Sequence, residues 1–216
     1  MDILQTLHNE NPYEGFDATK HPYDLQGWTD ALTIFEPLIN SLEPNLIIEV
    51  GSWKGQSAIR MAKHLESKGS PGKVLCVDTW LGGLEHWKKK GSVKKPWFEY
   101  LKLQNGYPSI YYQFLSNVVH SGMQDRIIPL PQTSLIAARL LKHYNIKSKM
   151  IFIDASHDTH DVVQDLTHYF PLLERGGVIF GDDYTWPSVE MAVKHFCKSN
   201  SLEFVVEGVV WKIVRR

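Results

Sequence analysis

The sequence alternates between short apolar runs rich in β-branched residues and longer segments whose apolar residues follow helical spacing. The short runs, which predict buried strands, are 46–50, 74–77, 126–130, 150–153 and 178–180. The longer segments predict helices from Trp28 to Leu42, through Ala58 to near Gly69, over 107–121, over 134–144, from Val162 to Leu173 and around Val189–Phe196. Such alternation predicts an α/β fold with a mostly parallel, doubly wound Rossmann-like sheet and helices on both faces.

The two ends of the chain depart from this alternation. Residues 202–206 and 209–214 are β-rich and are separated by Glu207-Gly208, so we expect a hairpin that adds an antiparallel strand at the C-terminus. Residues 1–27 and an insert at about 82–106 show no clean periodicity. We therefore divide the chain into an N-terminal segment with its helix (1–45) and a main α/β unit (46–216), within a single domain overall.

Charge and composition limit the kinds of partner. With 23 Lys and Arg against 24 Asp and Glu, the net charge of -1 gives no global attraction to nucleic acid, so a nucleic-acid partner is unlikely. No apolar run approaches the roughly 20 residues of a membrane-spanning helix. Cys76 and Cys197 show no metal or redox spacing, which favours a reducing, cytoplasmic compartment. Association into a homo-oligomer is left open.

Acidic residues stand at the ends of four predicted strands. They are Glu49, Asp78, Asp154 and the pair Asp182-Asp183. In open α/β sheets, ligands bind at the carboxyl edge of the strands, and carboxylates there need donors or cations to offset their desolvation. The pattern therefore favours a polar ligand at this edge over a purely structural role.

The loop after the first strand indicates what kind of ligand is bound. Gly51 and Gly55 allow a tight turn and close approach to a helix start, but Trp53 occupies the place of the second glycine of the dinucleotide fingerprint. Glu49 would repel a diphosphate, whereas it can accept a hydrogen bond from an ammonium group. S-adenosylmethionine has that ammonium and no phosphate. Asp78, placed to accept ribose hydroxyls, suits both NAD and S-adenosylmethionine.

Four motifs in order resemble class I methyltransferases, near the group that includes catechol O-methyltransferase and the macrolide-sugar and aminocoumarin O-methyltransferases. They are Glu49-Val-Gly-Ser-Trp-Lys-Gly-Gln-Ser57, Val77-Asp-Thr-Trp80, Phe152-Ile-Asp-Ala-Ser-His157 and Gly176-Gly-Val-Ile-Phe-Gly-Asp-Asp-Tyr184. The resemblance implies an S-adenosylmethionine-dependent methyltransferase. It also implies a cofactor site formed by Glu49, Gly51, Ser52, Trp53, Gly55, Ser57, Asp78, Thr79, Trp80 and Asp154, with Gln132, Thr133 and Ser134 near the adenine.

The same resemblance implies a divalent metal. In that group, an acid at the end of the fourth strand and two residues after the fifth hold the cation, and the matching positions here are Asp154, Asp182 and Asp183. Three carboxylates form a hard oxygen site suited to Mg²⁺ or Mn²⁺. Alternatively, Asp182 and Asp183 cap the loop that leads into the helix at Pro187.

The presumed general base differs from that of the relatives. Catechol-type enzymes place a lysine three residues after the metal aspartate, where this chain has His157, so His157 is the candidate base beside Asp154. The alternative is a histidine that bonds to the backbone at a helix start. We expect Asp165, with its neighbours His160 and Asp161, on the solvated face of that helix.

The methyl acceptor is the least constrained part of the prediction. We expect metal-assisted O-methylation of a small hydroxylated molecule of sugar or phenol type. The alternatives are metal-independent methylation of nitrogen or carboxylate, and S-adenosylmethionine binding without catalysis. The insert 86–98, with five lysines among aromatic residues, closes over an acidic or ring-shaped acceptor, contacts RNA, or is only a solvated loop. The N-terminal aromatic residues form another wall of the pocket or only pack on the domain. These residues are Tyr13, Phe16, Tyr23 and Trp28.

Overall fold

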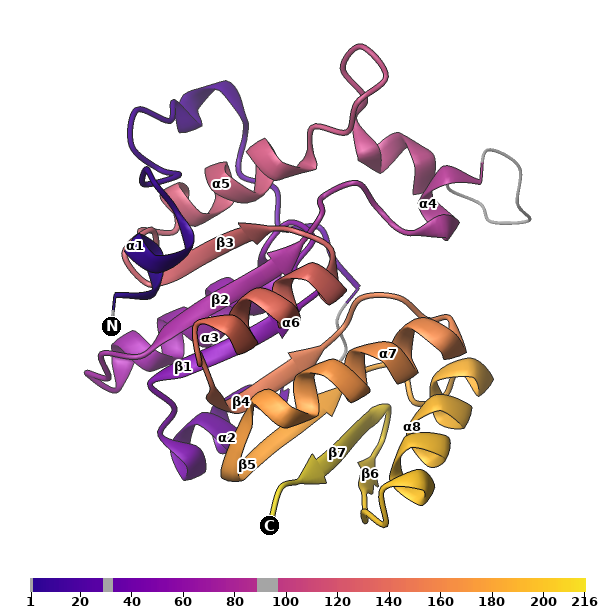
Figure 1. Ribbon diagram of the computed structural model, residues 1–216. Helices are drawn as coiled ribbons and strands as arrows, with labels where there is room; N and C mark the ends of the chain where they lie inside the picture. Colours follow the sequence, from indigo (N-terminus) through magenta and orange to yellow (C-terminus); the bar gives the residue numbers. More distant parts are fainter. Residues whose placement is uncertain (1, 29–32, 89–96) are drawn as a thin grey trace.

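The structure is a computed structural model that describes residues 2–28, 33–88 and 97–216. Its centre is a seven-stranded sheet in the order β3-β2-β1-β4-β5-β7-β6 (Figure 1). The five parallel strands are β1 (Leu46–Val50), β2 (Lys73–Asp78), β3 (Ile127–Pro131), β4 (Ser148–Ile153) and β5 (Leu173–Gly181). The order reverses between β1 and β4, which is where open sheets of this kind bind ligands.

The central strands are buried on both faces, as their continuous apolar sequences predict. Alternate residues of β1 point to opposite sides, so that Ile48 packs in one core cluster and Ile47 in the other. The first cluster includes side chains of α6 (Ser134–His143), α7 (Thr159–Tyr169) and α8 (Pro187–Ser199). The second includes side chains of α2 (Phe35–Leu42), α3 (Gln56–Ser67) and α5 (Ile110–His120). The doubly wound architecture predicted from the sequence is therefore confirmed.

Three predicted helix boundaries were wrong or are only partly described. Helix α7 ends at Tyr169, before a 3-10 turn η4 (Phe170–Leu172) that contains Pro171, and Leu173 already belongs to β5. Helix α5 starts at Ile110 rather than 107, because Tyr107 pairs with Gln104 in a tight turn. The helix predicted from Trp28 is represented by α2, which begins at Phe35; Trp28 itself is not helical, and residues 29–32 lie outside the described residues.

The C-terminal hairpin is also confirmed. Strand β7 (Val210–Val214) runs antiparallel to β5, and β6 (Val205–Glu207) pairs with β7 at the edge of the sheet. The first arm is shorter than the sequence predicts, since 202–204 are not in the strand.

The N-terminal segment covers the opposite edge of the sheet. It contains α1 (Ile3–Leu7) and a 3-10 turn η1 (Ala18–Lys20). The Tyr13 hydroxyl donates to the carbonyl of Ile127 at 3.0 Å, and a ring nitrogen of His8 lies 2.6 Å from the carbonyl of Pro129, both on β3. The segment then passes along α5, where the Ser116 hydroxyl contacts the carbonyls of Ala18 and His21 in the segment.

The insert contributes two short helices, α4 (Leu84–Trp87) and η3 (Trp97–Leu101), which lie beyond the carboxyl edge of the sheet (Figure 1). Four of its five lysines fall in 89–96, outside the described residues. Within the described chain, no helix combines the length and the apolar character that crossing a membrane requires.

Candidate active site

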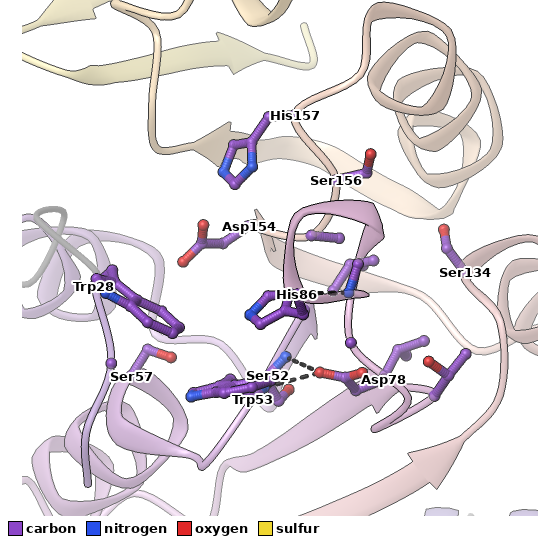
Figure 2. A pocket seen from close by; sticks show the side chains of 18 of the residues that line it. Trp28, Ser52, Trp53, Ser57, Asp78, His86, Ser134, Asp154, Ser156 and His157 are labelled. Carbon is purple, nitrogen blue, oxygen red and sulfur yellow. Dashed lines mark hydrogen bonds between the residues drawn. The ribbon is translucent and has the colours of Figure 1, made fainter. Parts of the chain in front are cut away.

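A cavity of about 370 Å³ opens at the carboxyl ends of β1, β2 and β4. Its floor is the loop between β1 and α3, and its walls come from the ends of β2 and β4 and from the loops after β3 and β5. The N-terminal segment and the insert contribute the roof, through Trp28, His86 and Trp97 among others. Figure 2 shows Asp154 and His157 on one side of the cavity and Trp53 and Asp78 on the other.

The floor loop needs glycine at its first position. Gly51 has φ +90°, and a Cβ added there would lie 1.9 Å from the carbonyl oxygen of Asp154. The absence of a side chain thus allows the loop to cross the end of β4 in direct backbone contact. Gly55 also has positive φ, and Trp53 adopts the left-handed region at φ +47° without being glycine.

Asp78 holds this loop in shape. One carboxylate oxygen accepts hydrogen bonds from the amides of Ser52 and Trp53 at 3.0 and 2.8 Å (Figure 2). The other accepts from the Trp80 amide at 2.7 Å. Burial raises the pKa of Asp78, and the three amide bonds oppose that rise. Because an ionised carboxylate offers about four acceptor positions, capacity remains for a ligand hydroxyl. The ribose role of Asp78 stays a prediction.

Glu49 lies behind the cavity wall. It is fully buried, and it accepts hydrogen bonds from the Ser57 hydroxyl and, at 3.5 Å, from the Cys76 thiol. Burial raises its pKa to about 7. Ser57, whose hydroxyl donates to Glu49, lines the cavity. The contact of Glu49 with an ammonium group stays a prediction, because Glu49 is outside the cavity lining and Ser57 is within it.

The predicted cofactor residues, including those described above, divide into two sets. Those that line the cavity are Gly51, Ser52, Trp53, Ser57, Asp78, Thr79, Gln132, Ser134 and Asp154. Those outside its lining are Glu49, Gly55, Trp80 and Thr133. Trp80 supports the loop by donating its indole N–H to the carbonyl of Trp53 at 2.7 Å, and Thr133 caps α6.

Asp165 is buried, although its sequence context predicts a position on the solvated face of α7. It is only 6% exposed, and it accepts a hydrogen bond from the Ser134 hydroxyl at the cavity wall. Burial raises the pKa of Asp165 to about 6. The prediction was wrong because Asp165 lies three residues after Val162 and four before Tyr169, on the buried face of α7. Its role is to orient Ser134.

Asp154, His157 and Asp183 form a group in which one potential ligand atom from each lies within 4.8 Å of the others. His157 Nε2 is 2.8 Å from a carboxylate oxygen of Asp183, and this hydrogen bond raises the pKa of His157. Asp182, predicted as a metal ligand, is not in the group; its carboxylate accepts from the Asp183 amide at 2.9 Å. His157 is the third member of the group.

Glu85 and Trp186 also line the cavity and are not among the site residues predicted from the sequence. A carboxylate oxygen of Glu85 lies 3.9 Å from His157 Nδ1, and the indole of Trp186 stacks on the His157 ring at 4.6 Å. Glu85 stands on the four-residue helix α4, which is too short to show periodicity. The only sequence feature that could have pointed to Glu85 is its place in the insert, which was a candidate to contact the acceptor.

The roof of the cavity is aromatic. Trp28 lies 5.5 Å from Trp53, 5.8 Å from His86 and 5.7 Å from Trp97, measured between ring centroids. His86 also packs on Trp53 at 4.7 Å. The N-terminal segment, the floor loop and the insert therefore meet through their rings. Of the four aromatic residues suggested as a wall of the pocket, Trp28 lines the cavity.

Comparison with known proteins identifies the family. A family model described as a methyltransferase domain matches residues 48–184, which include the floor loop and the Asp154 group. No curated protein matches this chain.

Solved structures share the fold at low sequence identity. The O-methyltransferase NovP is 15% identical, with 85% of this chain and 78% of that chain covered and a TM-score of 0.62. An O-methyltransferase from Bacillus cereus in complex with SAH is 16% identical, with 92% and 86% covered and a TM-score of 0.58. The SAH-bound methyltransferase PaMTH1 from Podospora anserina is 14% identical, with 88% and 80% covered and a TM-score of 0.61. The chain therefore belongs to this methyltransferase family and is a class I S-adenosylmethionine-dependent methyltransferase.

Proposed function

We propose that this enzyme transfers the methyl group of S-adenosylmethionine to a hydroxyl oxygen of a small molecule, with a divalent cation beside the acceptor. One observation carries the proposal: the group of Asp154, His157 and Asp183 lines the same cavity as the glycine loop and Asp78. The cofactor would lie along the floor loop, with its ribose near Asp78 and its adenine near Ser134. The acceptor would then lie between the roof and His157. Structural neighbours named as O-methyltransferases support oxygen as the nucleophile.

The residues of the group fit a cation. Two carboxylates and one imidazole converge at the cavity wall, and each of the three is partly buried. An imidazole ligand favours a transition metal such as Mn²⁺ over Mg²⁺, which prefers oxygen ligands alone. When bound, the cation supplies positive charge that stabilises the developing acceptor oxyanion. Asp182 would support the site from outside by fixing the backbone of Asp183.

A second mechanism is favoured by a specific contact. The 2.8 Å hydrogen bond between His157 and Asp183 is also the arrangement of a general base held by a carboxylate. In this alternative, Asp183 orients the imidazole, His157 takes the hydroxyl proton, and no cation is needed. The two mechanisms use the same residues, so only their metal dependence separates them.

Manganese binding provides the first test. We expect Mn²⁺, followed by electron paramagnetic resonance, to bind the wild-type protein at one site and not to bind Asp183→Ala. Glu174→Ala, which removes an exposed acid from β5, is the matched control and should bind Mn²⁺ normally. Both variants should bind S-adenosylhomocysteine with nearly unchanged affinity, since neither contacts the floor loop. Equal Mn²⁺ binding by both variants would disprove this cation site.

Turnover provides the second test. Release of S-adenosylhomocysteine is measured with a panel of phenols and sugars, before and after EDTA treatment and after Mn²⁺ is restored. Loss with EDTA and recovery with Mn²⁺ support the cation mechanism. Full activity in EDTA, together with its loss in His157→Ala, would instead support the histidine base. Turnover confined to amine or carboxylate acceptors would contradict O-methylation.

A further inference from the structure

Lys54 is a residue of the floor loop with an unusual environment. Its side chain is 1% exposed, yet it carries an ammonium group, which pairs with a carboxylate oxygen of Asp24 at 2.7 Å. The same ammonium lies 5.6 Å from the ring centroid of Tyr100 in η3. Asp24 belongs to the N-terminal segment and Tyr100 to the insert. One loop lysine therefore contacts both segments that form the roof.

Further polar groups lock this junction. The Asn117 side chain donates to the carbonyls of Lys54 and Asp24 at 2.8 and 2.7 Å, and it accepts from the Asp24 amide at 2.9 Å. Lys102, at the end of the insert, places its ammonium 3.3 Å from Asp24 and 3.3 Å from Gln113. Buried charges and amides cost free energy unless they are paired, so these contacts specify one arrangement of the three segments.

The residues after Asp24 then contact the floor loop in succession. The side-chain amide oxygen of Gln26 accepts from the Trp53 indole at 3.4 Å, and Gly27 packs closely against the side chain of Gln56. Trp28 packs on Trp53 and completes the aromatic roof. The segment 22–28, called the strap below, has Gly27 and Trp28 in the cavity lining and is held to Lys54 and Trp53 of the floor loop and to Gln56 at the start of α3.

We infer that Lys54 couples the floor loop to the roof, so that binding of S-adenosylmethionine to the loop stabilises the strap and the insert in the arrangement that forms the acceptor site. Lys54 is a positioning residue in this scheme, because it acts through Asp24 and Tyr100. The inference rests on the proposed cofactor role of the floor loop. It follows by linkage that the docked strap strengthens cofactor binding by the same factor.

Hydrogen–deuterium exchange tests the coupling, with S-adenosylhomocysteine as the probe. In the wild-type protein, the probe should slow exchange in 22–28 and 97–102 as well as in the floor loop. In Lys54→Met, which keeps an unbranched side chain one atom shorter and removes its charge, the loop should still be protected. The added protection of 22–28 and 97–102 should fall about 5-fold, and probe affinity should fall by a similar factor, at the lower end of typical coupling.

The matched control is Lys20→Met, which removes the lysine of an exposed pair with Asp17 in the same segment. It should respond to the probe as the wild type does. An unchanged response of 22–28 in Lys54→Met would overturn the inference. If Lys54→Met does not fold, the wild-type measurement decides, since bound probe without any effect on 22–28 would equally overturn it. Calorimetry that detects no probe binding at all would refute the cofactor assignment itself.

Discussion

Replacement of Gly51 by alanine tests the close contact between the floor loop and β4. A Cβ at this position would lie 1.9 Å from the Asp154 carbonyl oxygen and 2.5 Å from its carbonyl carbon, far inside van der Waals contact. Both atoms are backbone, so neither can turn away. An alanine at φ +90° also carries conformational strain of about 1–2 kcal/mol. Forced separation of packed elements costs about 1–3 kcal/mol.

The two contributions together predict a destabilisation of about 2–5 kcal/mol. For a chain of this size, about 2–4 °C of Tm are lost per kcal/mol, so Tm should fall by roughly 10 °C in thermal unfolding followed by circular dichroism. Because the displaced strand end carries Asp154, the variant should also bind S-adenosylhomocysteine more weakly in calorimetry.

Gly106→Ala is the matched control. Gly106 has a similar φ of +83°, but an added Cβ meets nothing within 4 Å, so the variant carries the conformational strain without the overlap. It should lose about 1–2 kcal/mol and keep its affinity for S-adenosylhomocysteine. Equal losses of Tm in the two variants would show that the loop moves away from β4 at little cost, and that the contact does not determine the geometry of the site.

Three further perturbations have defined outcomes. Asp165 has a folded-state pKa of about 6, above its unfolded value, so its ionisation lowers stability as pH rises from about 4 to 6. Asp165→Asn should therefore stabilise the protein by about 1–3 kcal/mol at pH 8 and not at pH 4. Equal urea midpoints of the two proteins at pH 8 would contradict this. Asp78→Ala leaves three backbone amides without their acceptor and should weaken S-adenosylhomocysteine binding at least tenfold in calorimetry, whereas unchanged affinity would disprove its role. Tyr13→Phe removes a buried hydrogen bond to Ile127 and should cost about 1 kcal/mol in urea unfolding, and a neutral result would mean that water replaces the hydroxyl.

The sheet and the acids at its carboxyl edge were predictable because they depend on local patterns. A run such as 46–50 is apolar without interruption except at Glu49, and it can be buried only inside a sheet covered on both faces. Parallel strands bring their carboxyl ends to one edge, so Asp78 and Asp154 had to lie near one another.

The roof was not predictable for a physical reason. Its geometry depends on contacts between residues far apart in the sequence, such as Asp24 with Asn117, and neither partner belongs to a periodic pattern that reveals the other. The position of Asp182 depends similarly on one backbone turn, in which Asp183 adopts φ +59° and directs its own carboxylate toward His157. The charge of Asp165 favours a solvated position and so gives a wrong prediction, although its spacing in α7 places it on the buried face.

The outer edge of β3 bears on the solubility of the chain. The backbone N–H and C=O groups of residues 127, 129 and 131 point away from β2. Two of these residues are prolines, which have no N–H to donate. Tyr13 and His8 occupy the carbonyls of the first two. An unprotected edge strand can recruit a strand from another molecule, but here the Ile127 N–H is bonded to the Met123 carbonyl, two residues have no N–H, and two of the three carbonyls are covered. Loss of the N-terminal segment would therefore expose a surface whose prolines still oppose aggregation.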